Sequence, residues 1–167
     1  MTFALRGAAL VAVAAPLLAI GAESATYTVR ELAPEAALKA AQAALASCRA
    51  SGYQVTVAVV DREGLARVLL RDRYAGAHTI GVATNKAWTA ASTRTPTGEV
   101  EKLSRPGQPL AGLRNVPRIV ALAGGLPIES AGTLVGAIGV SGAPGGDADE
   151  RCAKAGLAAI ADELELQ

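Results

Sequence analysis

Residues 54–70 constrain the fold of this chain more than any other segment. The run from Gln54 to Val60 is rich in β-branched residues and predicts a buried strand. The next four residues, Asp61 to Gly64, are of types that favour a tight turn, and Leu65 to Leu70 then predicts a partner strand. Because the two strands of a hairpin run antiparallel, this segment favours an antiparallel sheet.

The other predicted elements do not alternate one for one between strand and helix, which disfavours a doubly wound parallel sheet. Helices are expected from Pro34 to Gly52, from Thr79 to Ser92, from Thr97, and after Asp147 or Asp149, each of which can cap the last helix. Further strands are expected at Arg118–Ala123, Leu126–Glu129 and Leu134–Val140. We therefore predict an α/β fold of the α+β type: a single domain with a five-stranded antiparallel sheet flanked by helices.

The last predicted strand contains two glycines, Gly136 and Gly139. Glycine weakens a strand and is typical of places where another backbone or a ligand comes close. We expect such a close approach at this strand.

The N-terminal segment has the order of a secretory signal peptide, predicted at residues 1–22. Arg6 precedes an apolar run from Gly7 to Ile20, and small residues follow it. The run is about 14 residues long, short of the roughly 20 that cross a bilayer as a helix. We expect the domain to comprise residues 23–167, to have no membrane span after cleavage, and to be periplasmic or secreted.

The charge balance argues against two classes of partner. The full chain has 16 lysines and arginines and 15 acidic residues, and Arg6 is the only charged residue of the predicted signal peptide. The remaining domain is formally neutral, whereas binding to nucleic acid or to an anionic membrane needs a basic excess.

The chain has two cysteines, Cys48 and Cys152. In an oxidising compartment a pair of this kind predicts one disulfide, although two buried free thiols are the alternative. The bond would close a loop of about 100 residues, which contributes up to roughly 4.7 kcal/mol in the chain-entropy model.

Several kinds of catalytic and cofactor site are missing from the sequence. The single histidine, His78, excludes a site built from several histidines. The sequence has no Cys-x-x-Cys redox site, no motif for covalent haem attachment, no dinucleotide-binding glycine fingerprint and no phosphate-binding loop.

One cluster of residues has the chemistry of a haem site. A neutral imidazole can ligate haem iron, so His78 is the candidate axial ligand, with the phenol of Tyr74 as the alternative donor. Arg71, Arg73 and Lys86 are the nearest cations in sequence and could bind the propionates. The alternative is that His78 is a polar residue bonded to backbone near a helix start, and that Tyr74 is an ordinary surface residue.

Several segments of the chain resemble the GlcG/HbpS family of haem-binding proteins, which includes the C-terminal domain of PduO-type adenosyltransferases. The resemblance covers nearly the whole domain and is carried by residues 57–64, 85–90, 124–128, 135–142 and 149–156. It implies a five-stranded antiparallel sheet flanked by helices, symmetric oligomers, and haem or related tetrapyrrole binding in some members. The iron ligand is not uniform in the family. The assignment of His78 as the ligand therefore rests on the chemistry of imidazole and not on a family motif.

We therefore favour a secreted or periplasmic binding protein for non-covalent, b-type haem, which would carry, store or sense it, over an enzyme. The alternatives are a module for another small ligand, such as a hydroxy acid or a corrinoid, or a small enzyme with Lys86, Glu129 or Asp61 as acid–base groups. The small-residue surface and the Pro/Gly-rich loop 104–117 predict a homo-oligomer larger than a dimer.

Overall fold

The hairpin predicted in residues 54–70 is present in the computed structural model, which describes residues 24–165 of the chain. It consists of β1 (Thr56–Asp61) and β2 (Ala66–Arg71). A second hairpin consists of β3 (Gly125–Ser130) and β4 (Thr133–Ser141). The two hairpins join through antiparallel pairing of β1 with β4, so the sheet has the order β2-β1-β4-β3.

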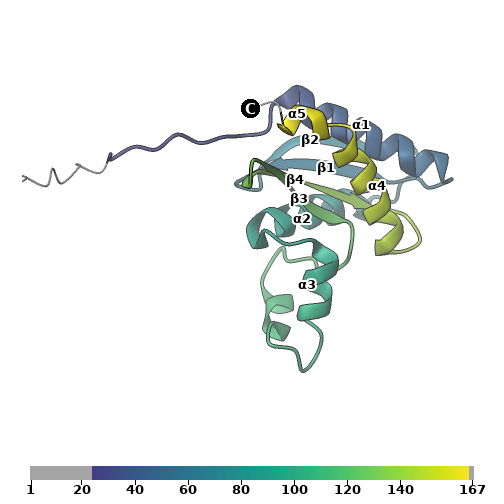
Figure 1. Ribbon diagram of the computed structural model, residues 1–167. Coiled ribbons are helices and arrows are strands. Elements are labelled where there is room, and N and C mark those ends of the chain that lie inside the picture. The colour runs from purple at the N-terminus through teal and green to yellow at the C-terminus, as the bar shows by residue number, and fades with distance from the viewer. Residues whose placement is uncertain (1–23, 166–167) are drawn as a thin grey trace, which may run out of the picture.

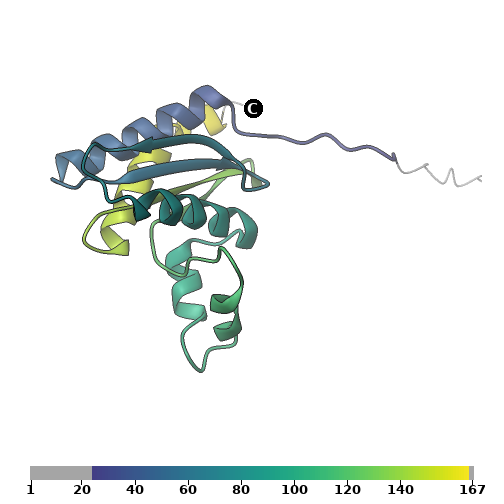
Figure 2. The ribbon, with the colours of Figure 1, turned by 180° about the vertical axis from the view of Figure 1, so that it is seen from behind.

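Helices cover both faces of this sheet (Figure 1). On one face lie α1 (Pro34–Ala50) and α4 (Gly146–Ala158), and the short α5 (Ala161–Glu165) follows α4. On the other face lies α2 (His78–Thr93). Beyond α2, the helix α3 (Thr97–Leu103) and the 3-10 helix Ala111–Asn115 form a lobe that projects from the body of the molecule (Figure 2).

The sheet has four strands within residues 24–165, so the prediction of a fifth strand at Arg118–Ala123 is wrong. Arg118 has a left-handed backbone with φ of 71°. The backbone N–H of Val120 donates to the hydroxyl of Thr89 on α2 at 3.0 Å, where a strand residue would bond to a neighbouring strand. Residues 118–122 are therefore bound to α2 and outside the sheet.

Small side chains let α2 lie very close to β4. A Cβ atom added to Gly139 would lie 2.1 Å from the carbonyl oxygen of Ala83 in α2. The buried Ala87 packs in the same layer, together with Val60 and Ala137 of the sheet. The close approach predicted from the glycines of this strand is confirmed at Gly139, and the approaching group is a helix backbone.

The predicted disulfide joins the two helices of the opposite face. Cys48 of α1 and Cys152 of α4 are bonded with their sulfurs 2.09 Å apart and their Cα atoms 5.5 Å apart. Both side chains are buried. The bond fixes the C-terminal part of α1 beside the middle of α4.

No helix within residues 24–165 is both long enough and apolar enough to cross a membrane. The predicted signal peptide, residues 1–22, lies outside the described residues.

Candidate functional site

A cleft of about 590 Å³ lies where α2 begins and α4 begins. Its lining includes three of the five binding residues predicted from the sequence: Tyr74, His78 and Lys86. The loop at residues 142–145, between β4 and α4, lines another part of it together with Gly146, the first residue of α4. The volume is within the range of about 300–1,000 Å³ that is usual for small-molecule and cofactor sites.

His78 and Tyr74 are on the accessible part of this cleft. His78 is the first residue of α2 and is exposed, and the Tyr74 side chain is 79% exposed. The imidazole lies against Gly76, because a Cβ atom there would be 2.8 Å from its Cε1 atom. An imidazole and a phenol, both open to solvent beside one cleft, are two groups that can ligate a metal.

The start of α2 is held in place by two threonines. The Thr79 hydroxyl donates to the carbonyl oxygen of Gly76 at 2.6 Å and lies 2.7 Å from the Thr56 hydroxyl on β1. Both threonine side chains are buried. The position of His78 is therefore fixed relative to the sheet by its neighbour in the chain.

Lys86 lies two turns further along α2 and is buried, with only 2% of it exposed. Its ammonium donates to the Asp149 carboxylate at 2.7 Å and to the carbonyl oxygen of Val140 at 2.9 Å. A side chain at position 124 would collide with this pair, since a Cβ atom on Gly124 would lie 2.9 Å from Nζ of Lys86. Lys86 lines the cleft, but its charge is already balanced by the Asp149 carboxylate.

Asp149 was expected only as a possible cap of the last helix, and this role is not what the structure shows. Its Oδ1 atom accepts from the backbone N–H of Ala143 at 2.9 Å, and Gly145 is the residue before α4. Burial raises the pKa of the Asp149 carboxyl, while the Lys86 ammonium acts in the opposite direction. Asp149 is thus the residue of the cleft that sequence reasoning missed. An acidic residue in the first turn of a helix normally signals capping, and nothing else in the sequence marks it.

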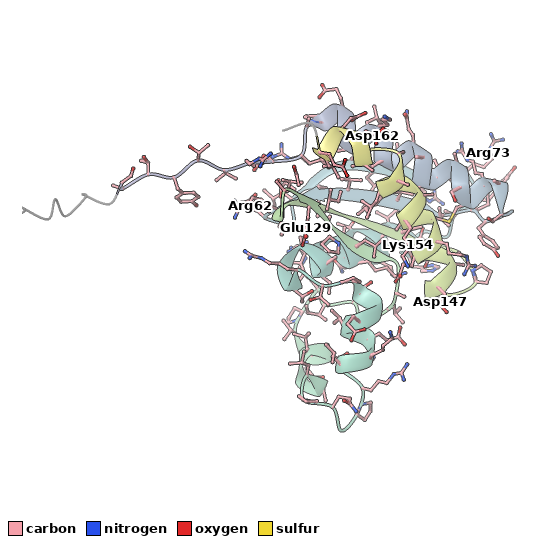
Figure 3. All side chains as sticks on the ribbon, in the orientation of Figure 1. Arg62, Arg73, Glu129, Asp147, Lys154 and Asp162 are labelled. Carbon is pink, nitrogen blue, oxygen red and sulfur yellow. A yellow bond between two sulfur atoms is a disulfide. The ribbon has the colours of Figure 1, made fainter. Side chains whose placement is uncertain are left out.

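The two predicted arginines are not among the residues that line the cleft. The Arg71 guanidinium donates through Nε to the carbonyl oxygen of Ala75 at 3.0 Å. Arg73 lies at the periphery of the molecule, near the end of α1 (Figure 3). Between them, the buried Asp72 accepts two hydrogen bonds from Arg49 of α1, at 2.8 and 2.9 Å. The ion pair between Asp72 and Arg49 therefore holds the end of β2 against the end of α1.

The two carboxylates named as possible acid–base groups are also remote from the cleft. Glu129 lies at the opposite end of the sheet from Arg73 (Figure 3). Asp61 accepts hydrogen bonds from the backbone of the β1–β2 turn at Glu63 and Leu65, and Arg67 lies 3.2 Å from it. These contacts are those of a turn-stabilising aspartate.

Comparison with known proteins places the chain among relatives of known structure. A family model described as haem degrading protein HbpS-like matches residues 32–158. The crystal structure of a double mutant of HbpS from Streptomyces reticuli is 42% identical, with a TM-score of 0.75, and the match covers 89% of this chain and 98% of that chain. A crystal structure of a PduOC:haem complex is 30% identical, with a TM-score of 0.74, and the match covers 78% of this chain and 95% of that chain.

Among curated proteins, the corrinoid adenosyltransferase PduO of Salmonella typhimurium is 34% identical over 90 residues. This match covers 53% of the chain but only 27% of the length of PduO. The family match at residues 32–158 includes every element that lines the cleft.

Proposed function

The chain belongs to the haem degrading protein HbpS-like family, and we propose that it binds haem non-covalently in the cleft between α2 and α4. The observation that carries this proposal is the position of His78. The only histidine of the sequence lies exposed beside a cleft of cofactor size, with Tyr74 on the same cleft. The haem complex of the PduOC relative supports the same class of ligand.

The groups around the cleft fit haem in two respects. First, His78 can supply an imidazole to the iron, and the Tyr74 phenol is the alternative donor. Second, Val82 and Leu122 give the lining apolar side chains that the ring can contact. Haem bound here would supply the redox and spectroscopic properties of its iron, while the chain's own residues position the ring and limit its contact with water.

Hemin titration followed by the Soret band tests this proposal. We expect a saturable Soret shift with the wild-type protein. His78→Ala should move the Soret maximum and weaken binding more than about tenfold, equivalent to about 1.4 kcal/mol. Tyr27→Phe is the matched control, because Tyr27 is 85% exposed and does not line the cleft.

The outcomes distinguish whether haem binds at all from which side chain ligates its iron. An unchanged spectrum and affinity in the His78 variant would remove this residue from the site, and the same titration of Tyr74→Phe would then test the phenol. Wild-type protein that shows no saturable change with hemin would refute haem binding.

A second candidate ligand is a corrinoid, which the 34% identity to PduO favours. A corrin is a tetrapyrrole of similar breadth, so the same cleft would be used. Quenching of the Trp88 fluorescence by hydroxocobalamin, compared with quenching by hemin, distinguishes the two ligands. Tighter binding of hydroxocobalamin would favour the corrinoid.

The protein would act outside the cytoplasm, as a carrier, store or sensor of haem. The disulfide between Cys48 and Cys152 supports this compartment, because such bonds persist where the environment is oxidising. Cell fractionation of the producing bacterium tests the location: we expect the processed chain in the periplasm or medium, and a full-length cytoplasmic chain would contradict it.

We also propose that the protein is a homo-oligomer larger than a dimer. Large apolar side chains are exposed at several places, among them Leu69 of β2, Ile80 of α2 and Leu110 of the projecting lobe. Burial of such side chains against another copy is favourable by roughly 25 cal/mol per Å². Light scattering that reports a stable monomer at micromolar concentration would refute this proposal.

A further inference from the structure

A second hollow adjoins the cleft. It has a volume of about 410 Å³ and lies between α2 and residues 119–122. Val82 and Leu122 line both the cleft and this hollow, so the two are adjacent. The lining of the second hollow is apolar except for one side chain, the arginine Arg114.

The Arg114 guanidinium is held by neutral groups. Its Nε atom donates to the carbonyl oxygen of Ser104 at 2.7 Å, and Nη2 donates to that of Glu101 at 3.1 Å. Within residues 24–165 no carboxylate lies within ion-pair distance of it. Since a guanidinium has five N–H donors, several remain for a carboxylate in the hollow.

The other cations near the cleft are less suited to bind an anionic ligand. Lys86 is paired with Asp149, so its charge is balanced. Arg71 bonds to the carbonyl oxygen of Ala75, and neither it nor Arg73 lines the cleft or the second hollow. Arg114 is thus the cation with an unbalanced charge on the surface that continues the cleft.

The segment that forms the wall of the second hollow is fixed in place. The Arg118 guanidinium lies 4.5 Å from the centre of the Trp88 ring on α2, and Val120 bonds to Thr89 of the same helix. The lobe that carries Arg114 joins the body of the molecule through this segment (Figure 2). A wall fixed on α2 in this way needs little reorganisation when a ligand binds.

We propose that Arg114 binds a propionate carboxylate of haem whose ring lies in the cleft against Val82 and Leu122. This assignment rests on the proposed function. Leu122 is 52% exposed, and the apolar edge of the ring would cover it. The long loop 104–117 then has a role in binding, because it places the cation that selects a carboxylate-bearing tetrapyrrole.

Paired titrations with hemin and with hemin dimethyl ester, in which both propionates are esterified, test this assignment. The ester has the same ring and iron but no carboxylate. We expect Arg114→Ala to weaken hemin binding by about tenfold or more, and Arg114→Gln to do the same. Neither variant should change the affinity for the ester by more than about twofold. Arg105→Ala is the control, since Arg105 is exposed and pairs with Glu101 outside both hollows.

The two ligands separate a loss of charge pairing from a loss of loop structure. If Arg114 only holds the loop through its bonds to two carbonyls, both variants will weaken hemin and the ester equally, and the assignment is overturned. Unchanged hemin affinity in both variants overturns it as well, while leaving haem binding intact. Failure of the wild-type protein to bind either compound refutes haem binding itself, and the assignment with it.

Discussion

The Lys86 ammonium lies 2.7 Å from the Asp149 carboxylate, and the two side chains are 2% and 5% exposed. The contact joins α2 on one face of the sheet to α4 on the other, at the end of β4. A buried ion pair of this kind stabilises the fold little more than a well-packed apolar pair would, because both charges lose their hydration. Its place in the lining of the cleft suggests that it fixes the geometry of the site.

Removal of one member of this pair should be far more damaging than removal of both. Lys86→Met leaves the Asp149 carboxylate buried without its counter-ion, and we expect it to lower the free energy of unfolding by about 3–5 kcal/mol. The double variant Lys86→Met with Asp149→Leu should lose clearly less free energy of unfolding than Lys86→Met alone. Urea denaturation of both variants measures the difference.

The exposed pair of Lys102 and Glu99 provides the control for this experiment. Its side chains are 67% and 47% exposed, so Lys102→Met should change the stability by less than about 1 kcal/mol. A Lys86→Met variant that is no less stable than the double variant would show that the pair carries no such coupling.

All but one of the elements predicted from local pattern are present, and the errors came from tertiary contacts. The strand expected at Arg118–Ala123 is apolar enough for a strand, but Thr89 of α2 binds its backbone. In α1, apolar side chains recur at steps of three and four from Leu38 through Ala41 and Leu45 to Cys48, which predicts a buried face. Leu38 is nevertheless 41% exposed, whereas Ala37 and Ala44 are fully buried. Because α1 and α4 pack closely, the smallest side chains lie between them, and residue size misleads as a guide to the core.

Prediction of the site was limited for a similar reason. His78, Tyr74 and Lys86 are close in sequence and stay together in the fold, since they lie on or just before one helix. Arg114 and Asp149 come from distant segments, and only the folded chain brings them to the same region. No local spacing marks either residue, so the sequence alone could not identify them.

The disulfide should contribute substantially to stability. It closes a loop across a sequence separation of 104 residues, and we expect Cys48→Ala with Cys152→Ala to cost about 2–5 kcal/mol. Urea denaturation of the double variant against the oxidised wild type measures this. Because both sulfurs are buried, the folded wild type should also resist mild reductant. Equal stabilities of the variant and the wild type would contradict the prediction.

The Asp72 carboxylate should give the protein an acid-sensitive contribution to stability. The hydrogen bonds from Arg49 are the largest cause that lowers the pKa of Asp72 below its ordinary value of 3.8. A carboxyl with a lowered pKa in the folded state stabilises the fold above the unfolded-state pKa, and this contribution is lost as the pH falls through the folded-state pKa.

Asp72→Asn isolates this effect, because other carboxyl groups titrate equally in the variant and the wild type. We expect the wild type to be the more stable protein near neutral pH, and its advantage to shrink as the pH falls below about 4. Urea midpoints measured across that range provide the check. A difference that stays constant with pH would exclude the ionised Arg49–Asp72 pair as its source.

The close contact between β4 and α2 gives the last prediction. A methyl group at position 139 would lie 2.1 Å from the carbonyl oxygen of Ala83, so α2 must shift for Gly139→Ala to fold. We expect a loss of about 1–3 kcal/mol, as for other overpacked interiors. Because α2 carries His78 and Lys86, the shift should also weaken hemin binding.

Gly81→Ala on α2 is the matched control: nothing lies within 4 Å of its added Cβ, and it should stabilise the protein by about 0.5–1 kcal/mol. Gly139→Ala that matches Gly81→Ala in urea midpoint would show that β4 and α2 tolerate a wider separation than the structure indicates.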